Sequence, residues 1–394
     1  MPSPSRLAIV FLLSATVFAP PALAFTPTGN PVADKFLELL KASGAQDLAY
    51  GSVRNSGDRV ELGEVTTRIT DQSDSFTVKI GTVGLAGGSI NGDGILTTGS
   101  FDMSGFSMTS EDFALTLETL DARTVTFPPV ETIRDAAMAY NASSIYESAV
   151  ATNAAISGSD GLYIPIREIR ATNADFVENI PRTANMNVSD ITVSTKNLPN
   201  SDFRQAMTDL GYEEVAFNVV TDWKWDDEAG RFELPQFTIS GNDFAQLTWT
   251  FRLGGWTREL VTELAALNPD DEQAAQAVLG KMQSTTIEAI SLQLEDRSAV
   301  NRVIDNRAAF ANLPREEFIS RTVGGLAGPL AALNNPDFQN MIVTELRQFM
   351  TDPKTLTINV APENPIPIAQ IIGMVAIAPQ TLPAILGVTV EAGR

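Results

Sequence analysis

Long stretches of this chain alternate between apolar and polar side chains, and this alternation constrains the fold more than any other feature. The stretch QLTWTFRLGGW, residues 246–256, places apolar residues at every second position: Leu247, Trp249, Phe251 and Leu253. Threonine and arginine stand between them. Because successive side chains of a β-strand point to opposite faces, a period of two predicts a strand with one apolar face and one polar face.

The same period fills residues 58–127 and returns in several runs between 160 and 256. Turn-forming residues separate the runs, as in NGDG at 91–94 and DDEAG at 226–230, where a β-hairpin is expected. The sequence therefore predicts long, twisted antiparallel sheets arranged as a meander.

Helical patterns stand at three places along the chain. Residues 30–44 place Asn30 at the N-cap and Pro31 at the first helical position, with an apolar stripe formed by Val32, Phe36, Leu39 and Leu40. We expect this helix to cover one end of a sheet, and the alternative is a helix that docks a partner. Residues 130–157 are also predicted to be helical. From Thr257 onward helices dominate, interrupted by strands at 286–296 and 354–362.

These patterns predict an α+β fold with helices that cover the sheets and a helix-rich C-terminal third. We divide the sequence into a signal peptide (1–24), a helix with a β-meander (25–127), a helix with a second β-rich region (128–256) and a helical region (257–394).

The first 24 residues have the three parts of a secretory signal. Arg6 precedes an apolar run, Leu7 to Ala19, and Ala22-Leu23-Ala24 supplies the small residues of a cleavage site before Phe25. A membrane anchor is the alternative, but 13 apolar residues are fewer than the roughly 20 that a spanning helix needs. The chain also has no cysteine, which is more typical of a bacterial periplasmic protein than of a disulfide-bonded secreted one. We therefore expect export to the periplasm and no stable transmembrane segment after cleavage.

The composition excludes several chemistries and partners. Without histidine or cysteine, a Ser-His-Asp triad, a thiol nucleophile and a histidine- or thiolate-bound zinc are impossible. Cleavage of the signal leaves 26 basic and 48 acidic residues, a net charge of −22, which repels nucleic acid and anionic membranes. We expect no cofactor, no metal site and no nucleic-acid partner.

Carboxylates are the one abundant catalytic residue type that remains. The stretch DWKWDDE, residues 222–228, sets acidic residues beside Trp223 and Trp225, as a glycoside hydrolase requires. On a strand, however, Asp222 and Asp226 point to the face opposite the two tryptophans. We therefore expect the acids on a solvated face and the tryptophans in the core, and we assign no catalytic residue.

The most apolar segment after the N-terminus is Ile366 to Ala378, which Pro367 interrupts. It is too short to span a bilayer. It also lacks the lysine and arginine face of a typical interfacial helix, so we expect a buried helix.

The stretch MTDLGYEEVAFNVVTDWKWDDEAGRFELPQFTISGNDFAQLTWTFRLGG, residues 207–255, resembles the AsmA and TamB-like repeating-β envelope proteins of Gram-negative bacteria. The similarity lies in strand rhythm and turn chemistry and extends over residues 58–127 and 160–296. It implies an apolar groove along a curled sheet and a role in lipid or outer-membrane homeostasis. The larger members keep an N-terminal membrane anchor, whereas this sequence predicts a cleaved signal.

Two interpretations of the apolar side of residues 246–256 remain open. Its side chains either pack beneath the C-terminal helices, which is the commoner arrangement, or line a groove for an apolar ligand. The candidate ligand-binding residues are Leu247, Trp249, Phe251 and Leu253. The leading hypothesis is a non-enzymatic periplasmic protein that binds or chaperones an apolar ligand, most simply a lipid. The alternatives are an envelope interaction protein with a closed core and a carboxylate-dependent glycan hydrolase.

Overall fold

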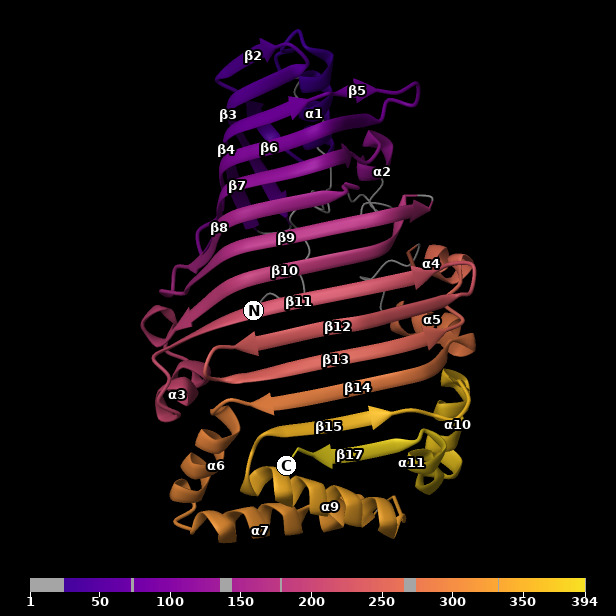
Figure 1. Ribbon diagram of the computed structural model, residues 1–394. Helices are drawn as coiled ribbons and strands as arrows, with labels where there is room; N and C mark the ends of the chain where they lie inside the picture. Colours follow the sequence, from indigo (N-terminus) through magenta and orange to yellow (C-terminus); the bar gives the residue numbers. More distant parts are fainter. Residues whose placement is uncertain are drawn as a thin grey trace. The chain divides into compact units, whose positions relative to one another are not determined.

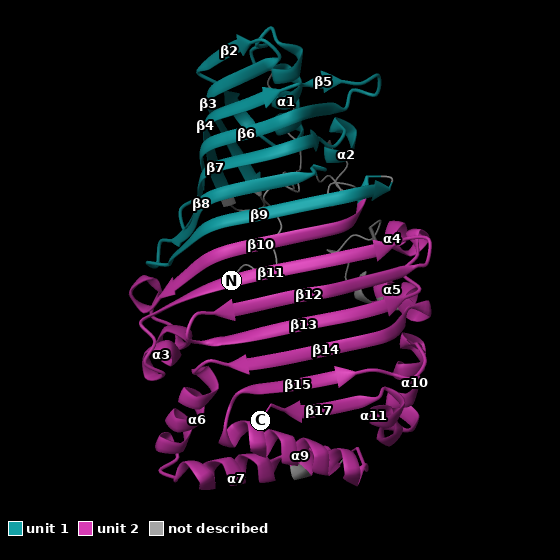
Figure 2. Ribbon diagram, viewed as in Figure 1, with its two compact units in different colours: residues 1–180 teal, residues 181–394 magenta. Residues whose placement is uncertain are grey.

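The computed structural model describes residues 25–71, 74–134, 144–177, 179–265, 274–331 and 333–393 (Figure 1). The chain divides into two compact units, one ending at Ile180 and the other beginning at Pro181 (Figure 2). Strands form 48% of the structure and helices 30%, and the long antiparallel pairing that the alternation predicted is present. The predicted signal, residues 1–24, lies outside the described residues. The division between the units falls inside the region that we delimited as 128–256.

Unit 1 is an antiparallel meander of strands. Strands β3, β4, β6, β7, β8 and β9 pair in that order, β1 and β2 both pair with β3, and β5 pairs with β6. The bounds are β1 (Gln46–Ala49), β2 (Ser52–Ser56), β3 (Arg59–Asp71), β4 (Asp74–Ala86), β5 (Ser89–Ile90), β6 (Leu96–Thr109), β7 (Phe113–Thr126), β8 (Ser148–Gly158) and β9 (Tyr163–Val177).

A helix closes the apolar face of this sheet. Helix α1 (Pro31–Ala42) begins where the Asn30 side chain accepts hydrogen bonds from the backbone N–H groups of Val32 and Ala33, at 3.0 and 3.2 Å. Its residues Ala33, Phe36, Leu37 and Leu39 are buried in the core of the unit. The sequence predicted the helix and two of these four residues, because the buried stripe lies slightly to one side of the predicted one.

The segment after Phe127 differs from the predicted helix over 130–157. Helix α2 covers only Val130–Arg134, residues 135–143 lie outside the described residues, and 148–158 form strand β8. The alanines of this stretch favour a helix in isolation. In the folded chain, however, β8 pairs on both sides with β7 and β9, and Ala149, Ala151 and Ala154 enter the core as small side chains. Tertiary pairing overrides the local propensity here.

Unit 2 is a second antiparallel meander. Strands β10, β11, β12, β13, β14, β15 and β17 pair in that order, and β16 pairs with β14. The bounds are β10 (Ile180–Ser194), β11 (Glu214–Asp226), β12 (Arg231–Gly241), β13 (Ala245–Gly254), β14 (Thr286–Asp296), β15 (Thr355–Val360), β16 (Ile366–Pro367) and β17 (Val388–Ala392). The hairpin expected at residues 226–230 joins β11 to β12. The strands expected at 286–296 and 354–362 are β14 and β15.

Helices stand between and after these strands. They are α3 (Asp202–Asp209), α4 (Arg258–Ala265), α5 (Ala274–Lys281), α6 (Ala299–Phe310), α7 (Arg315–Gly325), α8 (Ala327–Ala331), α9 (Pro336–Thr351), α10 (Ile368–Ile377) and α11 (Leu382–Ile385), with 3₁₀ turns η3 (Thr195–Asn197), η4 (Met282–Ser284) and η5 (Pro379–Thr381).

Helices α6, α7 and α9 bury their apolar side chains against one another. Ile304, Ile319 and Val323 form the centre of this cluster, and its partly buried neighbours also come from α6, α7 and α9. The cluster lies beside β17 at one edge of the sheet (Figure 1). There the Glu345 carboxylate accepts a hydrogen bond from the Ala392 backbone N–H at 2.8 Å, and Gln348 donates one to the Ala392 carbonyl at 3.2 Å. These helices therefore cap the edge of the sheet and do not cover its face.

Candidate ligand-binding face

The register of unit 2 aligns apolar residues of successive strands into rows on one side of the sheet. Trp249 pairs with Leu292, which pairs with Ile358, which pairs with Val390. Two parallel rows flank this one: Ile239–Leu247–Leu294–Leu356 and Leu234–Phe251–Ile290–Val360–Val388. We call these three rows the apolar face of unit 2.

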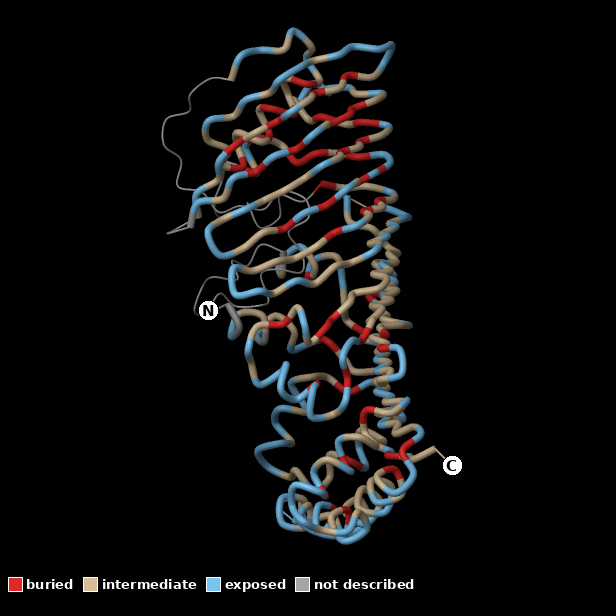
Figure 3. Tube along the Cα trace, turned by 90° about the vertical axis from the view of Figure 1, so that its left-hand side faces the viewer, coloured by how far each residue is buried: buried red, intermediate tan, exposed pale blue. Residues whose placement is uncertain are grey.

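The apolar face is largely open on β13, β14 and β15, whereas Val390 at its β17 end is buried. Trp249 keeps 43% of its surface exposed, Leu292 37%, and Leu247 and Ile358 36% each. Strands β14 and β15 contain no buried residue, and Figure 3 shows the strands of unit 2 mainly in the colours of intermediate and exposed residues. In unit 1, by contrast, Leu62, Val83 and Leu85 on the corresponding strands are fully buried. The two units thus have the same kind of strand but differ in whether helices cover the apolar side.

The opposite side of the unit 2 sheet is polar and internally bonded. Ser291 and Asn359 form a side-chain hydrogen bond of 2.7 Å, and Gln293 donates to Thr357 at 3.3 Å. Arg231 and Arg252 both pair with Glu288, at 3.2 and 2.9 Å. This polar side is suited to contact with water. The apolar face on the other side of the sheet is exposed too, although its side chains are poorly suited to water.

Aromatic rings continue the apolar face toward the β11–β12 hairpin. The ring of Trp249 lies 5.4 Å from that of Phe251, which lies 5.8 Å from that of Phe232. Phe232 in turn contacts Trp223 at 5.8 Å and Trp256 at 5.4 Å. Such contacts form a connected strip of large, polarisable surface.

The four candidate residues from the sequence all lie on β13 and on this face. Leu247 and Trp249 are exposed, whereas Phe251 and Leu253 are half-buried. One of the two interpretations placed these residues beneath the C-terminal helices. Leu247 and Trp249 are exposed, so that interpretation is wrong for these two residues. Sequence reasoning missed their partners Leu292, Ile358 and Phe232, which have the same alternation but belong to strands whose pairing the sequence alone did not establish.

The acidic residues of the hairpin have separate structural partners. Asp222 accepts a hydrogen bond from Asn185 on the neighbouring strand, and Asp226 accepts one from the Ala229 backbone N–H at 2.9 Å. The side chain of Asp227 is only 1% exposed and lies between two arginines, with Arg182 at 2.6 Å and Arg258 on its other oxygen. Trp225 is buried nearby and donates its indole N–H to the Trp256 carbonyl at 2.8 Å.

The two arginines keep Asp227 ionised. The pKa of its carboxyl group is lowered, chiefly because Arg258 donates a hydrogen bond to it and also because Arg182 does. A general acid needs the opposite shift. Asp227 is therefore suited to hold β10, the hairpin loop and the start of α4 together, and not to donate a proton.

Replacing Asp227 with asparagine should destabilise the protein at pH 7, because two arginines then lose their shared counter-ion. A lowered carboxyl pKa stabilises the fold at pH values above the unfolded pKa of about 4, and this contribution is lost as the pH falls through the lower folded value. The difference in urea midpoint between wild type and Asp227→Asn should therefore be largest at pH 7 and shrink below pH 4. Asp226→Asn, which keeps its acceptor oxygen, is the matched control. If the difference in urea midpoint between wild type and Asp227→Asn does not depend on pH, the assignment of Asp227 as the ionised partner of the two arginines is wrong.

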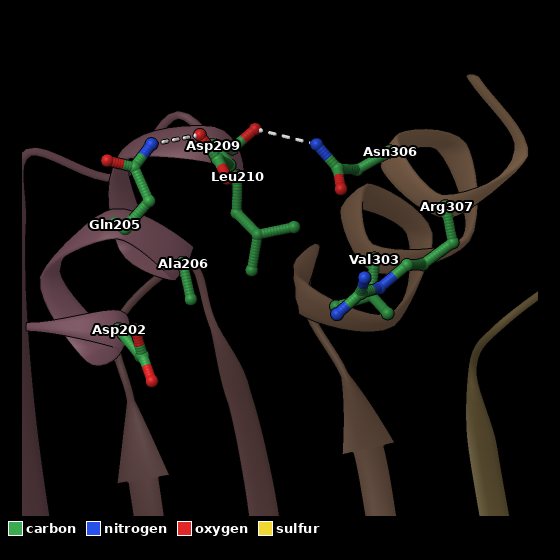
Figure 4. Close-up of a pocket in the computed structure, with 8 residues that line it drawn as sticks. All are labelled: Asp202, Gln205, Ala206, Asp209, Leu210, Val303, Asn306 and Arg307. Carbon is green, nitrogen blue, oxygen red and sulfur yellow. Dashed lines mark hydrogen bonds between the residues drawn. The ribbon is translucent and has the colours of Figure 1, made fainter. Parts of the chain in front are cut away.

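A hollow of about 370 Å³ lies between α3 and α6 (Figure 4). Leu210 and Val303 approach it from opposite sides, and Asn306 donates a hydrogen bond across it to the Asp209 carbonyl at 3.2 Å. Arg302 of α6 stacks on the Tyr212 ring at 4.2 Å and donates to the Leu210 carbonyl. These contacts join the two helices, so the hollow is best explained as part of their junction.

In the described part of the chain, no group of three or more acidic side chains is arranged to hold a metal ion. None of the helices described is both long enough and apolar enough to cross a bilayer.

Comparison with known proteins gives a partial match. A family model described only as "Uncharacterized protein" matches residues 238–393, which run from within β12 to just beyond β17. The matched segment contains most of the apolar face. No match is found among curated proteins.

Proposed function

We propose that this protein binds an apolar ligand, specifically the acyl chain of a lipid, on the apolar face of unit 2, and that it carries or shields this ligand without catalysing a reaction on it. The observation that carries the proposal is the row Trp249–Leu292–Ile358, which is more than one-third exposed on a sheet whose other side is polar.

The dimensions of the face fit such a ligand. The apolar face runs across β12, β13, β14, β15 and β17. Neighbouring strands lie about 4.8 Å apart, so the face extends for about 19 Å across the strands. This span is on the scale of an extended acyl chain. Each CH₂ group removed from water contributes about 0.8 kcal/mol, and part of the total is offset by the cost of ordering the ligand.

The sequence also favours a particular cellular location for this activity. The N-terminal pattern with its cleavage site before Phe25 and the absence of cysteine favour the periplasm. The resemblance to AsmA and TamB-like proteins, in which an apolar groove is associated with lipid homeostasis, favours an envelope function. The paired arginines around Asp227 give no support to the hydrolase alternative.

Native mass spectrometry tests the proposal directly. Protein purified gently from the envelope of cells that express the whole sequence should carry a phospholipid or fatty acid in stoichiometric amount, identified by extraction. A mass without ligand, under conditions that keep lipid on a known carrier, would refute lipid carriage as the main function.

A further inference from the structure

Helix α10 is the second large apolar surface of unit 2, and its composition differs from that of ordinary surface helices. No residue of α10 is buried, which contradicts the buried helix that the sequence predicted. Ile368, Ile371 and Met374 are half-buried on one side of the helix, whereas Ile372, Val375 and Ile377 are exposed by 46%, 57% and 85%. A surface helix normally presents polar residues to water, but Gln370 is the one polar side chain in this helix.

The absence of charge extends well beyond the helix. No Asp, Glu, Lys or Arg occurs between Glu363 and Glu391, although charged residues make up 19% of the sequence. The one other charge-free stretch of this length is 7–33, which contains the predicted signal. Ile385 of α11 lies within the same segment and is 38% exposed.

We propose that α10 and the adjoining α11 form a docking surface for a zwitterionic phospholipid bilayer. Net charge distinguishes between the possible binding partners of this surface. A second copy of the chain would bring another net charge of about −21 against the first, and an anionic membrane would also be repelled. A zwitterionic bilayer has no net charge and provides an apolar layer into which exposed isoleucine and valine side chains can insert at a shallow depth.

The position of α10 agrees with this function. Figure 1 shows α10 and α11 at the side of the sheet where strand β15 ends and strand β17 begins. The helix is anchored there because the Ile368 backbone N–H donates a hydrogen bond to the Thr285 carbonyl at 2.9 Å, immediately before β14. The docking surface has its own residues and does not require that the apolar face bind lipid.

Flotation with lipid vesicles tests the docking surface. Protein from cells that express the whole sequence should float with phosphatidylcholine vesicles, and adding phosphatidylglycerol to half of the lipid should reduce the bound fraction. Ile377→Glu should lower binding at least tenfold. Phe310→Glu is the matched control, because Phe310 is 83% exposed at the end of α6 and the change in charge is identical. The control should bind within twofold of wild type.

Three outcomes would overturn the inference: wild type that does not float with phosphatidylcholine, binding that Ile377→Glu leaves unchanged, or binding that phosphatidylglycerol strengthens. If wild type fails to float but sediments as a dimer that Ile377→Glu dissociates, the surface is a contact between copies and the bilayer is excluded. Lipid carriage measured by mass spectrometry is independent of all these outcomes, so failure of one proposal is distinguishable from failure of the other.

Discussion

Replacing Phe127 with alanine should lower the free energy of unfolding by about 3–5 kcal/mol, the usual range for a large buried aromatic side chain. Phe127 is 1% exposed, and its ring lies 5.9 Å from that of Phe36 and 5.7 Å from that of Phe101. The variant removes the contact of α1 with the sheet at this point and leaves a cavity between them. Urea unfolding followed by circular dichroism measures the change.

The matched variant in unit 2 is Trp249→Ala. It also removes a large aromatic side chain from the apolar side of a sheet, but Trp249 is 43% exposed, so the expected loss is about 1 kcal/mol or less. All four tryptophans, including Trp249, lie in unit 2, so their fluorescence reports the unfolding of that unit alone. A loss for Trp249→Ala as large as that for Phe127→Ala would mean that the face of unit 2 is covered in solution.

The contrast between these two residues marks what the sequence could and could not predict. Alternation placed Phe127 at the end of the predicted strand region 58–127 and Trp249 on the apolar side of a strand, because side-chain period is a local property. Which face is covered depends on where the helices pack, and this is a property of the whole fold. Helix α1 has a broad apolar stripe and settles on the unit 1 sheet, whereas α6, α7 and α9 are apolar toward one another.

For the same reason, the sequence predicted only part of the candidate ligand-binding face. Residues 246–256 were identified as a strand with an apolar side, and β14 and β15 were identified as strands. That Leu292 and Ile358 continue the row from Trp249 follows only from pairing across 43 and 66 further residues of chain, which contain α4, α5 and the helical cluster. The sequence did not predict strand β17, because its five alternating residues follow directly on the long apolar segment that contains α10.

Leu292→Glu should reduce the amount of co-purified lipid at least tenfold. Leu292 lies between Trp249 and Ile358 at the centre of the apolar face, so a carboxylate there must either be desolvated against the acyl chain or exclude it. A tenfold loss corresponds to about 1.4 kcal/mol, which is well below the several kcal/mol that full desolvation of a charge costs. Because Leu292 is 37% exposed, the glutamate can reach water in the unliganded protein, and folding should be retained. Native mass spectrometry and displacement of a fluorescent fatty acid measure the loss.

Gln293→Glu is the control that makes this result specific. Gln293 is the next residue on β14 and points to the polar side, where its side chain contacts Thr357. Both variants add one negative charge at nearly the same position, so a general electrostatic effect on an acidic protein would reduce lipid binding equally in both. Retention of lipid by Gln293→Glu together with its loss from Leu292→Glu would place the ligand on the apolar side of the sheet. Equal behaviour of the two variants would contradict that placement, even if lipid co-purifies with the wild-type protein.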